Sequence, residues 1–257
     1  MEHSTGIFFG PVEIIIYTVV MLGLITASAY GASIKYKLVQ LGLPENRHPS
    51  EEELPKRLWT TVYDVFYWCF RGVRPIVGIM HTFVFVGFLA FLLATTHHVL
   101  RAYTNNVEFS ILGAVSPFID KSYALLADVF CILVLIGIGS LAYRRFAMKP
   151  KGLYPPPEAQ GVLVNKESRE NPWVESLITI LFISALMVTY LSTEGTAVAW
   201  VQQGNASFDF QLWRPFSSTF GFLLYTFQLP SAALVGIYHV SWWLHILCVL
   251  GFAAYIP

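Results

Sequence analysis

The stretch that decides the fold begins Arg74-Pro-Ile-Val-Gly-Ile-Met-His81 and continues without a formal charge to Thr95-Thr-His97-His98. It is longer than the ~20 apolar residues that a helix needs to cross a bilayer. Pro75 stands at its start, where a helix tolerates proline. Histidine is costly inside such a segment, so His81 near one end and the pair His97-His98 near the other are candidates for function. Because imidazole is a usual axial ligand of haem iron, the stretch predicts a membrane helix that supplies haem ligands.

The composition places the whole chain among integral membrane proteins. Of its 257 residues, 55% are hydrophobic and only 12% are charged, and the mean hydropathy is +0.58. Soluble proteins carry about 25% charged residues. The formal net charge is zero, so nothing in the charge balance points to a nucleic-acid partner.

Five apolar runs are long enough to be membrane spans, and two shorter ones are not. The five runs lie at about 12–34, 75–100, 122–143, 173–200 and 231–257. The aromatic run 58–70 predicts an interfacial helix, and 216–227 predicts a re-entrant or surface-lying helix. The expected fold is an all-α integral membrane bundle of five transmembrane helices with interfacial helices, in one domain over residues 1–257. Residues 101–121 are expected to form a loop.

The distribution of lysine and arginine predicts the orientation. Loops 35–74 and 144–172 hold seven and six of these residues, whereas the opposite side holds three: Arg101, Lys121 and Arg214. The positive-inside rule then makes the two basic loops cytoplasmic, with the N-terminus outside and the C-terminus in the cytoplasm. The expected location is the cell membrane, with several passes.

This orientation gives each histidine a depth. His81 and His98 are 17 residues apart, or about 25 Å of helix, which leaves room for two cofactors across the membrane. His239 falls near the outer edge of the last span, and His245 about 9 Å deeper. His98, His239 and His245 can therefore share one leaflet, whereas His81 has no histidine partner at its own depth. The alternatives are a solvated His97-His98 pair and hydrogen-bonded core histidines at the other positions.

Two carboxylates join the outer histidines. Asp128 and Glu194 lie near the outer ends of their spans, and neither would stay unpaired in lipid. They can carry protons released by a quinol or accept hydrogen bonds from ligating histidines. The alternative is a structural hydrogen bond to a neighbouring helix or to Arg101. Three glycines suit the close approach of a porphyrin or of another helix: Gly87, Gly137 and Gly139.

Several motifs in a fixed order resemble one family. They are Arg74-Pro-x-x-Gly-x-Met-His81, Asp128 with Tyr143-Arg-Arg145, Glu194-Gly195, Trp242-Trp-x-His245 and Gly251-Phe-x-x-Tyr-Ile-Pro257. The chain resembles the membrane anchor of heterodisulfide-reductase-like iron–sulfur oxidoreductases, which is similar to the nitrate reductase gamma subunit. The resemblance implies a cytochrome b with one or two haems b. Such a protein exchanges electrons between membrane quinone and a cytoplasmic iron–sulfur or flavoprotein partner.

The resemblance also assigns ligands, with two departures. His81 matches the second-helix haem ligand and His245 the first ligand of the fifth helix. The family's second-helix ligands are ten residues apart, but Phe91 stands at that position here, so the outer ligand must be His97 or His98. In the family, the Tyr-Ile-Pro run leads to further histidines and to cluster-binding cysteines. We therefore expect a cytoplasmic iron–sulfur domain, with a partner for His81, beyond Pro257.

Two functions are consistent with these residues. The first is a haem b electron-transfer subunit of a quinone-linked oxidoreductase, with substrate chemistry elsewhere and no catalytic residue in this chain. Its iron ligands would be His81, His245 and His98, with His97 and His239 as further cofactor-binding candidates. Glu194, Asp128 and Arg101 are its quinone or proton candidates. The alternative is a haem-free membrane anchor that docks a redox partner through the basic loops.

Overall fold

The computed structural model describes residues 9–42, 53–71, 75–148 and 172–255, and this part of the chain is helical, with no strand. The elements are α1 (Pro11–Gln40), α2 (Glu53–Arg71), α3 (Pro75–Thr104), α4 (Ile111–Val115), α5 (Pro117–Tyr143), the π-helical turn η1 (Arg144–Met148), α6 (Pro172–Val201), α7 (Pro215–Thr226) and α8 (Ser231–Tyr255). Proline is the first residue of five of these helices. It lacks an N–H group, and the N–H groups of a helix's first turn have no partner within the helix.

Five of the helices are long and apolar enough to cross a membrane: α1, α3, α5, α6 and α8. The expectation of five spans is therefore confirmed, and the protein is a helical membrane protein. The expectation of a loop over 101–121 is wrong in part, because α3 runs on to Thr104 and α5 begins at Pro117. The short α4 lies between them, capped by the Ser110 side chain, which accepts a hydrogen bond from the Gly113 N–H.

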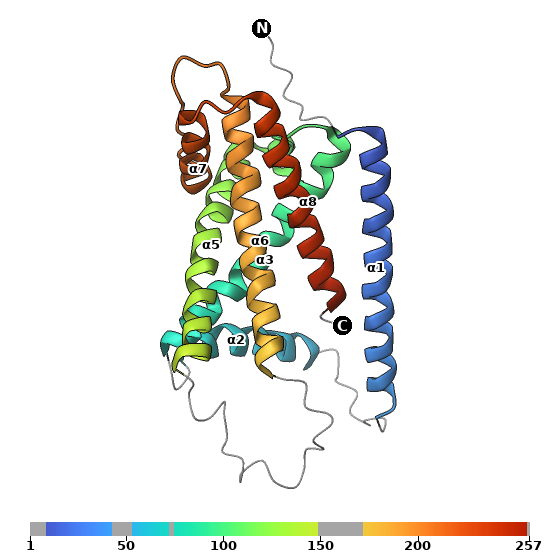
Figure 1. Ribbon diagram of the computed structural model, residues 1–257. Coiled ribbons are helices and arrows are strands. Elements are labelled where there is room, and N and C mark those ends of the chain that lie inside the picture. Colours follow the sequence, from blue (N-terminus) through green and yellow to red (C-terminus); the bar gives the residue numbers. More distant parts are fainter. Residues whose placement is uncertain (1–8, 43–52, 72–74, 149–171, 256–257) are drawn as a thin grey trace.

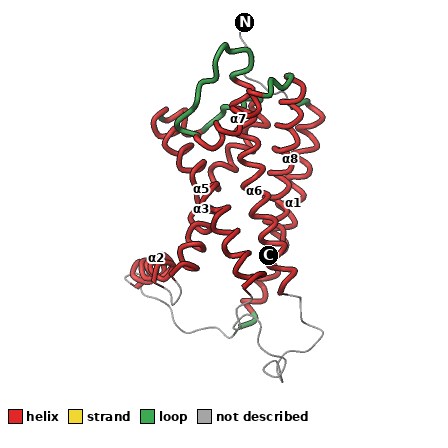
Figure 2. The backbone as a smooth tube through the Cα atoms, turned by 60° about the vertical axis from the view of Figure 1, so that its left-hand side comes forward, coloured by secondary structure: helices red, strands yellow, loops and turns green. Residues whose placement is uncertain are grey.

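Two helices lie at opposite ends of the bundle and do not cross it (Figures 1 and 2). α2 runs across one end, which we call the α2 end, and α7 packs beside α6 at the other, which we call the α7 end. On α2, Leu54, Leu58 and Val62 recur at four-residue intervals on one exposed side, as in a helix that lies on a membrane surface.

Glycines allow two pairs of helices to approach closely. A Cβ atom on Gly137 of α5 would lie 2.8 Å from the Met80 carbonyl oxygen of α3. A Cβ atom on Gly195 of α6 would lie 2.9 Å from the Ser217 carbonyl oxygen of α7. Both distances are shorter than a side-chain carbon tolerates, so α3–α5 and α6–α7 depend on these small residues for their packing.

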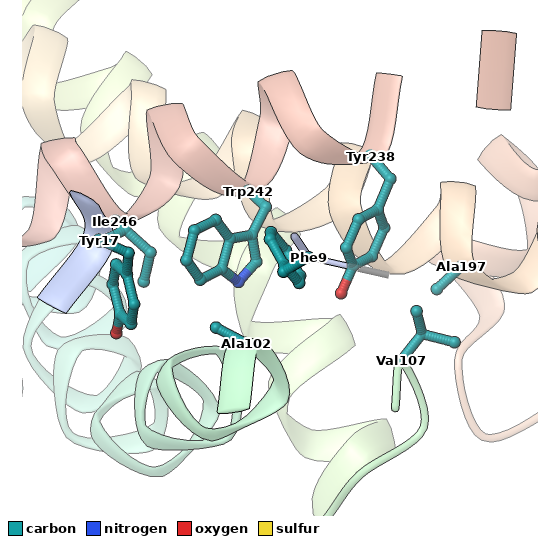
Figure 3. Close-up of a cluster of buried hydrophobic side chains, with 8 residues drawn as sticks. All are labelled: Phe9, Tyr17, Ala102, Val107, Ala197, Tyr238, Trp242 and Ile246. Carbon is teal, nitrogen blue, oxygen red and sulfur yellow. The ribbon is translucent and has the colours of Figure 1, made fainter. Parts of the chain in front are cut away.

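An aromatic cluster fastens α1 to the bundle at the α7 end (Figure 3). Trp242 of α8 contacts both Phe9 and Tyr17, with ring centroids 4.6 and 4.9 Å apart. Tyr17 is the buried residue of α1, whereas the apolar side chains farther along that helix are largely exposed. α1 is therefore held to the bundle through its first half. The same cluster joins α8 to α3 through Trp242 and Ala102.

Candidate functional site

His98 of α3 and His245 of α8 face each other inside the bundle. Each side chain is 1% exposed, and the ring centroids are 4.8 Å apart at an interplanar angle of 78°. Tyr190 of α6 stacks on the His98 ring at 5.6 Å. The Trp242 indole N–H donates to the His98 carbonyl oxygen over 3.0 Å, which ties α8 to α3 at this level. Three spans therefore converge on one imidazole pair.

Hydrogen bonds determine which nitrogen of each ring keeps a free lone pair. His245 Nδ1 lies 3.2 Å from the Leu186 carbonyl oxygen, which can only accept, and 3.1 Å from the Thr189 hydroxyl, which already donates to the Ala185 carbonyl oxygen, so Nδ1 carries the proton. His98 Nε2 lies 2.8 Å from a carboxylate oxygen of Glu194 and is the protonated nitrogen by the same argument. His245 Nε2 and His98 Nδ1 are buried and have no hydrogen-bond partner among the described residues. The pair therefore presents two unused lone pairs inside the membrane domain.

Glu194 of α6 is the centre of a buried ionic cluster. Its carboxylate bonds to His98, to the Arg101 guanidinium of α3 and, at 3.2 Å, to Arg214 just before α7. The Arg101 and Glu194 side chains are each only 4% exposed. Arg101 and Arg214 thus share one carboxylate, and guanidiniums can also bind a further anionic or electron-rich group beside the cluster.

A small polar cavity of about 20 Å³ adjoins the ionic cluster. It has room for a single water molecule. Its walls include Glu194, Arg101 and Arg214 together with the side chains of His97, Asp120 and Tyr123. Asp120 is only half-buried, at the start of α5. The cavity thus lies between the ionic cluster and the surface at the α7 end.

The other predicted outer histidines have separate partners. His97 is buried, but its Nε2 accepts the N–H of Ile111 over 3.2 Å and so helps to hold α4. His239 Nδ1 lies 3.0 Å from a carboxylate oxygen of Glu13, and the His239 ring stacks on Phe9 at 4.7 Å. Neither ring lies against His245. The structure thus brings together His98 and His245, whereas His97 and His239 contact other groups. His239 Nε2 is also buried without a hydrogen-bond partner among the described residues.

His81 is exposed on α3, toward the α2 end. It precedes Val99 by 18 residues, which is five full turns, so both lie on the same side of the helix. Val99 packs against the aromatic cluster of α1 and α8. His81 therefore points toward the side of α1 and α8 at a level where α1 is exposed. Its expected histidine partner beyond Pro257 lies outside the described residues.

Asp128 anchors α7 and is fully buried. One of its carboxylate oxygens accepts the Phe216 N–H over 2.7 Å, and the other accepts the Ser217 hydroxyl over 2.6 Å. The positive end of the α7 helix dipole also stabilises the negative charge of the Asp128 carboxylate at its N-terminus. The sequence left open a structural role for Asp128, in which it bonds to a neighbouring helix or to Arg101. The hydrogen bonds that the structure shows for Asp128 join it to α7.

Sequence reasoning assigned no functional role to two residues of this site. Arg214 was used only for the charge count, although it is the one basic residue between α6 and α8, where a charge close to a membrane calls for a partner. Tyr190 gave no signal beyond its aromatic character. Among the described residues, no group of three or more His, Cys, Asp or Glu side chains is arranged to hold a metal ion.

The fold and the site define a helical membrane protein with a buried histidine pair and ionic cluster, and two curated proteins are similar to it. A probable iron–sulfur-binding oxidoreductase, FadF of Bacillus subtilis (strain 168), is 22% identical over 233 residues, covering 89% of this chain and 28% of that protein. The EtfAB:quinone oxidoreductase of Syntrophomonas wolfei subsp. wolfei (strain DSM 2245B / Goettingen) is 25% identical over 251 residues, covering 96% of this chain and 31% of that protein.

No protein-family model and no solved structure matches the chain. The chain spans less than a third of the length of the two curated relatives. Both relatives are oxidoreductases, so the similarity indicates a redox role for the chain.

Proposed function

We propose that this chain is a membrane haem b module that exchanges electrons between the quinone/quinol pool and a cytoplasmic iron–sulfur oxidoreductase domain or subunit. The observation that carries the proposal is the buried pair His98 and His245, on facing helices, with one unused nitrogen lone pair on each ring. Two imidazoles are a usual axial ligand set for a haem that relays electrons. The relatives' names, an iron–sulfur-binding oxidoreductase and a quinone oxidoreductase, support the two ends of the route.

The donor set fits a haem in its chemistry. The Leu186 carbonyl holds the His245 ring in the tautomer that a ligand requires, as backbone carbonyls do at metal sites. Ring centroids 4.8 Å apart are in direct contact, so the two imidazoles must separate to admit a porphyrin between them. Bound haem would supply a reversible one-electron carrier. The Arg101 and Arg214 guanidiniums suit a haem propionate or the oxygen of a quinol.

Oxidation of a quinol to a quinone releases two electrons and two protons, and the proton acceptors proposed here belong to the ionic cluster. Glu194 can accept a proton only if Arg101 or Arg214 gives up its bond to the carboxylate, because both now hold it in the ionised form. Asp128 is engaged by α7 on both oxygens, so it ranks behind Glu194 as a proton carrier.

His81 is proposed as a ligand of an inner haem. It is exposed on the side of α3 that faces α1 and α8, and the family resemblance assigns it that role. The proposed orientation, with the N-terminus outside, puts His81 in the cytoplasmic leaflet, next to the electron-transfer partner. A route from the α7 end through His98 and His245 to His81 would then lead across the membrane.

Reduced-minus-oxidised spectra of the purified full-length protein test the proposal. We expect a b-type signal, and we expect His245→Ala and His98→Ala each to lose haem. His97→Ala is the matched control, since His97 is also a buried histidine of α3 at the same end. A purified protein without any b-type signal would refute the proposal. Equal loss of haem in all three variants would move the ligand assignment away from His98.

The second candidate is a haem-free membrane anchor that docks a redox partner through its basic loops. The direct contact between the His98 and His245 rings is the observation that favours it, because the pair is packed as it stands. The same spectra separate the two functions. In the anchor, His245→Ala would lower stability but change no absorbance between 400 and 600 nm, roughly the range in which a haem would absorb.

A further inference from the structure

A lipid-facing groove runs between α3 and α5 near the α2 end. Its volume is about 530 Å³, within the ~300–1,000 Å³ that is usual for small-molecule sites. Apolar side chains from both helices form its walls, including Ile76 and Met80 of α3 and Leu135 and Ile136 of α5. The groove takes no part in the histidine site, which lies toward the α7 end.

The groove has the length of one membrane leaflet. Its apolar wall along α5 begins at Leu135, and Arg144 follows nine positions later, a step of about 14 Å along a helix; Met148 of η1 lines the groove beyond that charge. Half of a ~30 Å hydrocarbon core is about 15 Å. Arg144 comes directly after the last residue of α5, and Ile76 lies in the first turn of α3, so the polar end of the groove is at the membrane boundary.

Gly139 keeps the groove open. A Cβ atom on this residue would meet nothing within 4 Å, whereas Gly137, half a turn away, is pressed against the Met80 carbonyl. Two glycines of one helix thus serve different purposes. Gly137 lets α3 approach, and Gly139 faces outward and leaves space for a molecule from the membrane. Ser140 beside it is exposed as well.

Arg144 gives the open end of the groove a positive charge. It is half-buried, and it makes no ion pair with another described residue. It belongs to the basic loop 144–172, which together with the loop 35–74 holds most of the chain's basic residues. Basic residues at a membrane boundary attract anionic lipid headgroups, by about 1 kcal/mol for each side chain.

We infer that this groove binds an anionic phospholipid, with one acyl chain along Leu135, Ile136 and Gly139 and the phosphate at Arg144. The apolar walls match the acyl chain, the leaflet length matches its extent, and the guanidinium, which has no ion-pair partner among the described residues, matches the phosphate. A zwitterionic lipid would fill the same walls but gain less from Arg144. The inference does not depend on haem.

Native mass spectrometry of the full chain, released from nanodiscs of equal parts phosphatidylglycerol and phosphatidylcholine, tests this site. The wild type is expected to retain one phospholipid after mild delipidation, with phosphatidylglycerol preferred. Arg144→Gln should lower that preference about fivefold, the effect of one basic side chain near a membrane. Gly139→Leu should remove the retained lipid altogether. Gly236→Leu is the matched control, because a Cβ there also meets nothing within 4 Å and Gly236 does not line this groove.

Three results would overturn the inference. They are an unchanged lipid preference in Arg144→Gln, equal lipid loss in Gly139→Leu and Gly236→Leu, or a quinone in place of the phospholipid in the wild-type spectrum. Arg144→Gln removes no ion pair with another described residue and keeps most of the side chain, so its result stands even if Gly139→Leu folds poorly.

Discussion

Replacing Glu194 by glutamine should disrupt the ion pairs of the cluster while nearly preserving the shape of the side chain. The carboxylate holds His98, Arg101 and Arg214, and glutamine can offer these three donors only one neutral oxygen. In one of its two orientations, the glutamine amide would turn its N–H groups toward a guanidinium, which can also only donate. Arg101, whose side chain is 4% exposed, would then be left buried without a counter-charge.

The expected loss of stability is large because the remaining charge cannot reach water. Breaking a buried ion pair by removing one partner costs about 3–5 kcal/mol. Arg214 is 18% exposed and can regain part of its hydration, so most of the cost comes from Arg101. Glu13→Gln is a matched control at the same end of the bundle. Glu13 is 25% exposed and accepts from His239 and Trp243, so its loss should cost about 1 kcal/mol.

Unfolding in detergent, followed by the fluorescence of the seven tryptophans, measures these free energies. The double variant Glu194→Gln/Arg101→Gln should be more stable than the sum of its two single variants predicts, because the unpaired charge is removed with its partner. The reasoning is wrong if Glu194→Gln is as stable as Glu13→Gln and the double variant is additive.

Three further changes have expected outcomes. His81→Ala in the full-length protein should lower the haem-to-protein ratio without removing the whole b-type signal; a ratio equal to that of the wild type would exclude His81 as a ligand. Gly137→Leu should lower the unfolding free energy by about 1–3 kcal/mol, the cost of overpacking a close contact, here with Met80. Asp128→Ala removes the cap of α7 and should cost about 0.5–2 kcal/mol. Hydrogen exchange over residues 215–226 should then accelerate, and unchanged exchange would contradict the anchoring role.

Sequence reasoning predicts the spans well because the bilayer imposes a single strong requirement. A helix must present about 20 apolar residues, so the run 173–200 could be recognised before α6 was seen to cover Pro172–Val201. The same physics predicts that Glu194 is paired, since an ionised carboxylate in lipid is costly. Successive residues of a helix are turned by about 100°, which predicts that His97 and His98 cannot face one neighbour, and their separate partners agree.

The partners themselves could not be predicted, because they depend on how the helices pack. Arg214 reaches Glu194 only because α7 docks against α6 through Gly195 and is capped by Asp128. By helical angle, His98 lies nearer than His97 to the face that the family's ten-residue spacing implies, but the choice needs the position of His245 on α8. Likewise, depth alone allowed His239 to share a leaflet with His98, whereas the structure shows its contact with Glu13.

The shortness of α7 determines whether the number of membrane-crossing helices is odd or even. Its 12 residues extend about 18 Å, well below the ~30 Å of a hydrocarbon core, so the chain enters and leaves this helix at the same end of the bundle. The candidate spans among the described residues therefore remain five, an odd number, and α1 begins at the end of the bundle opposite to the one toward which α8 runs. About eight additional apolar residues in α7 would make it a sixth crossing and reverse the insertion of α8. A single short insertion would thus separate the histidine of α8 from that of α3, although neither helix had changed.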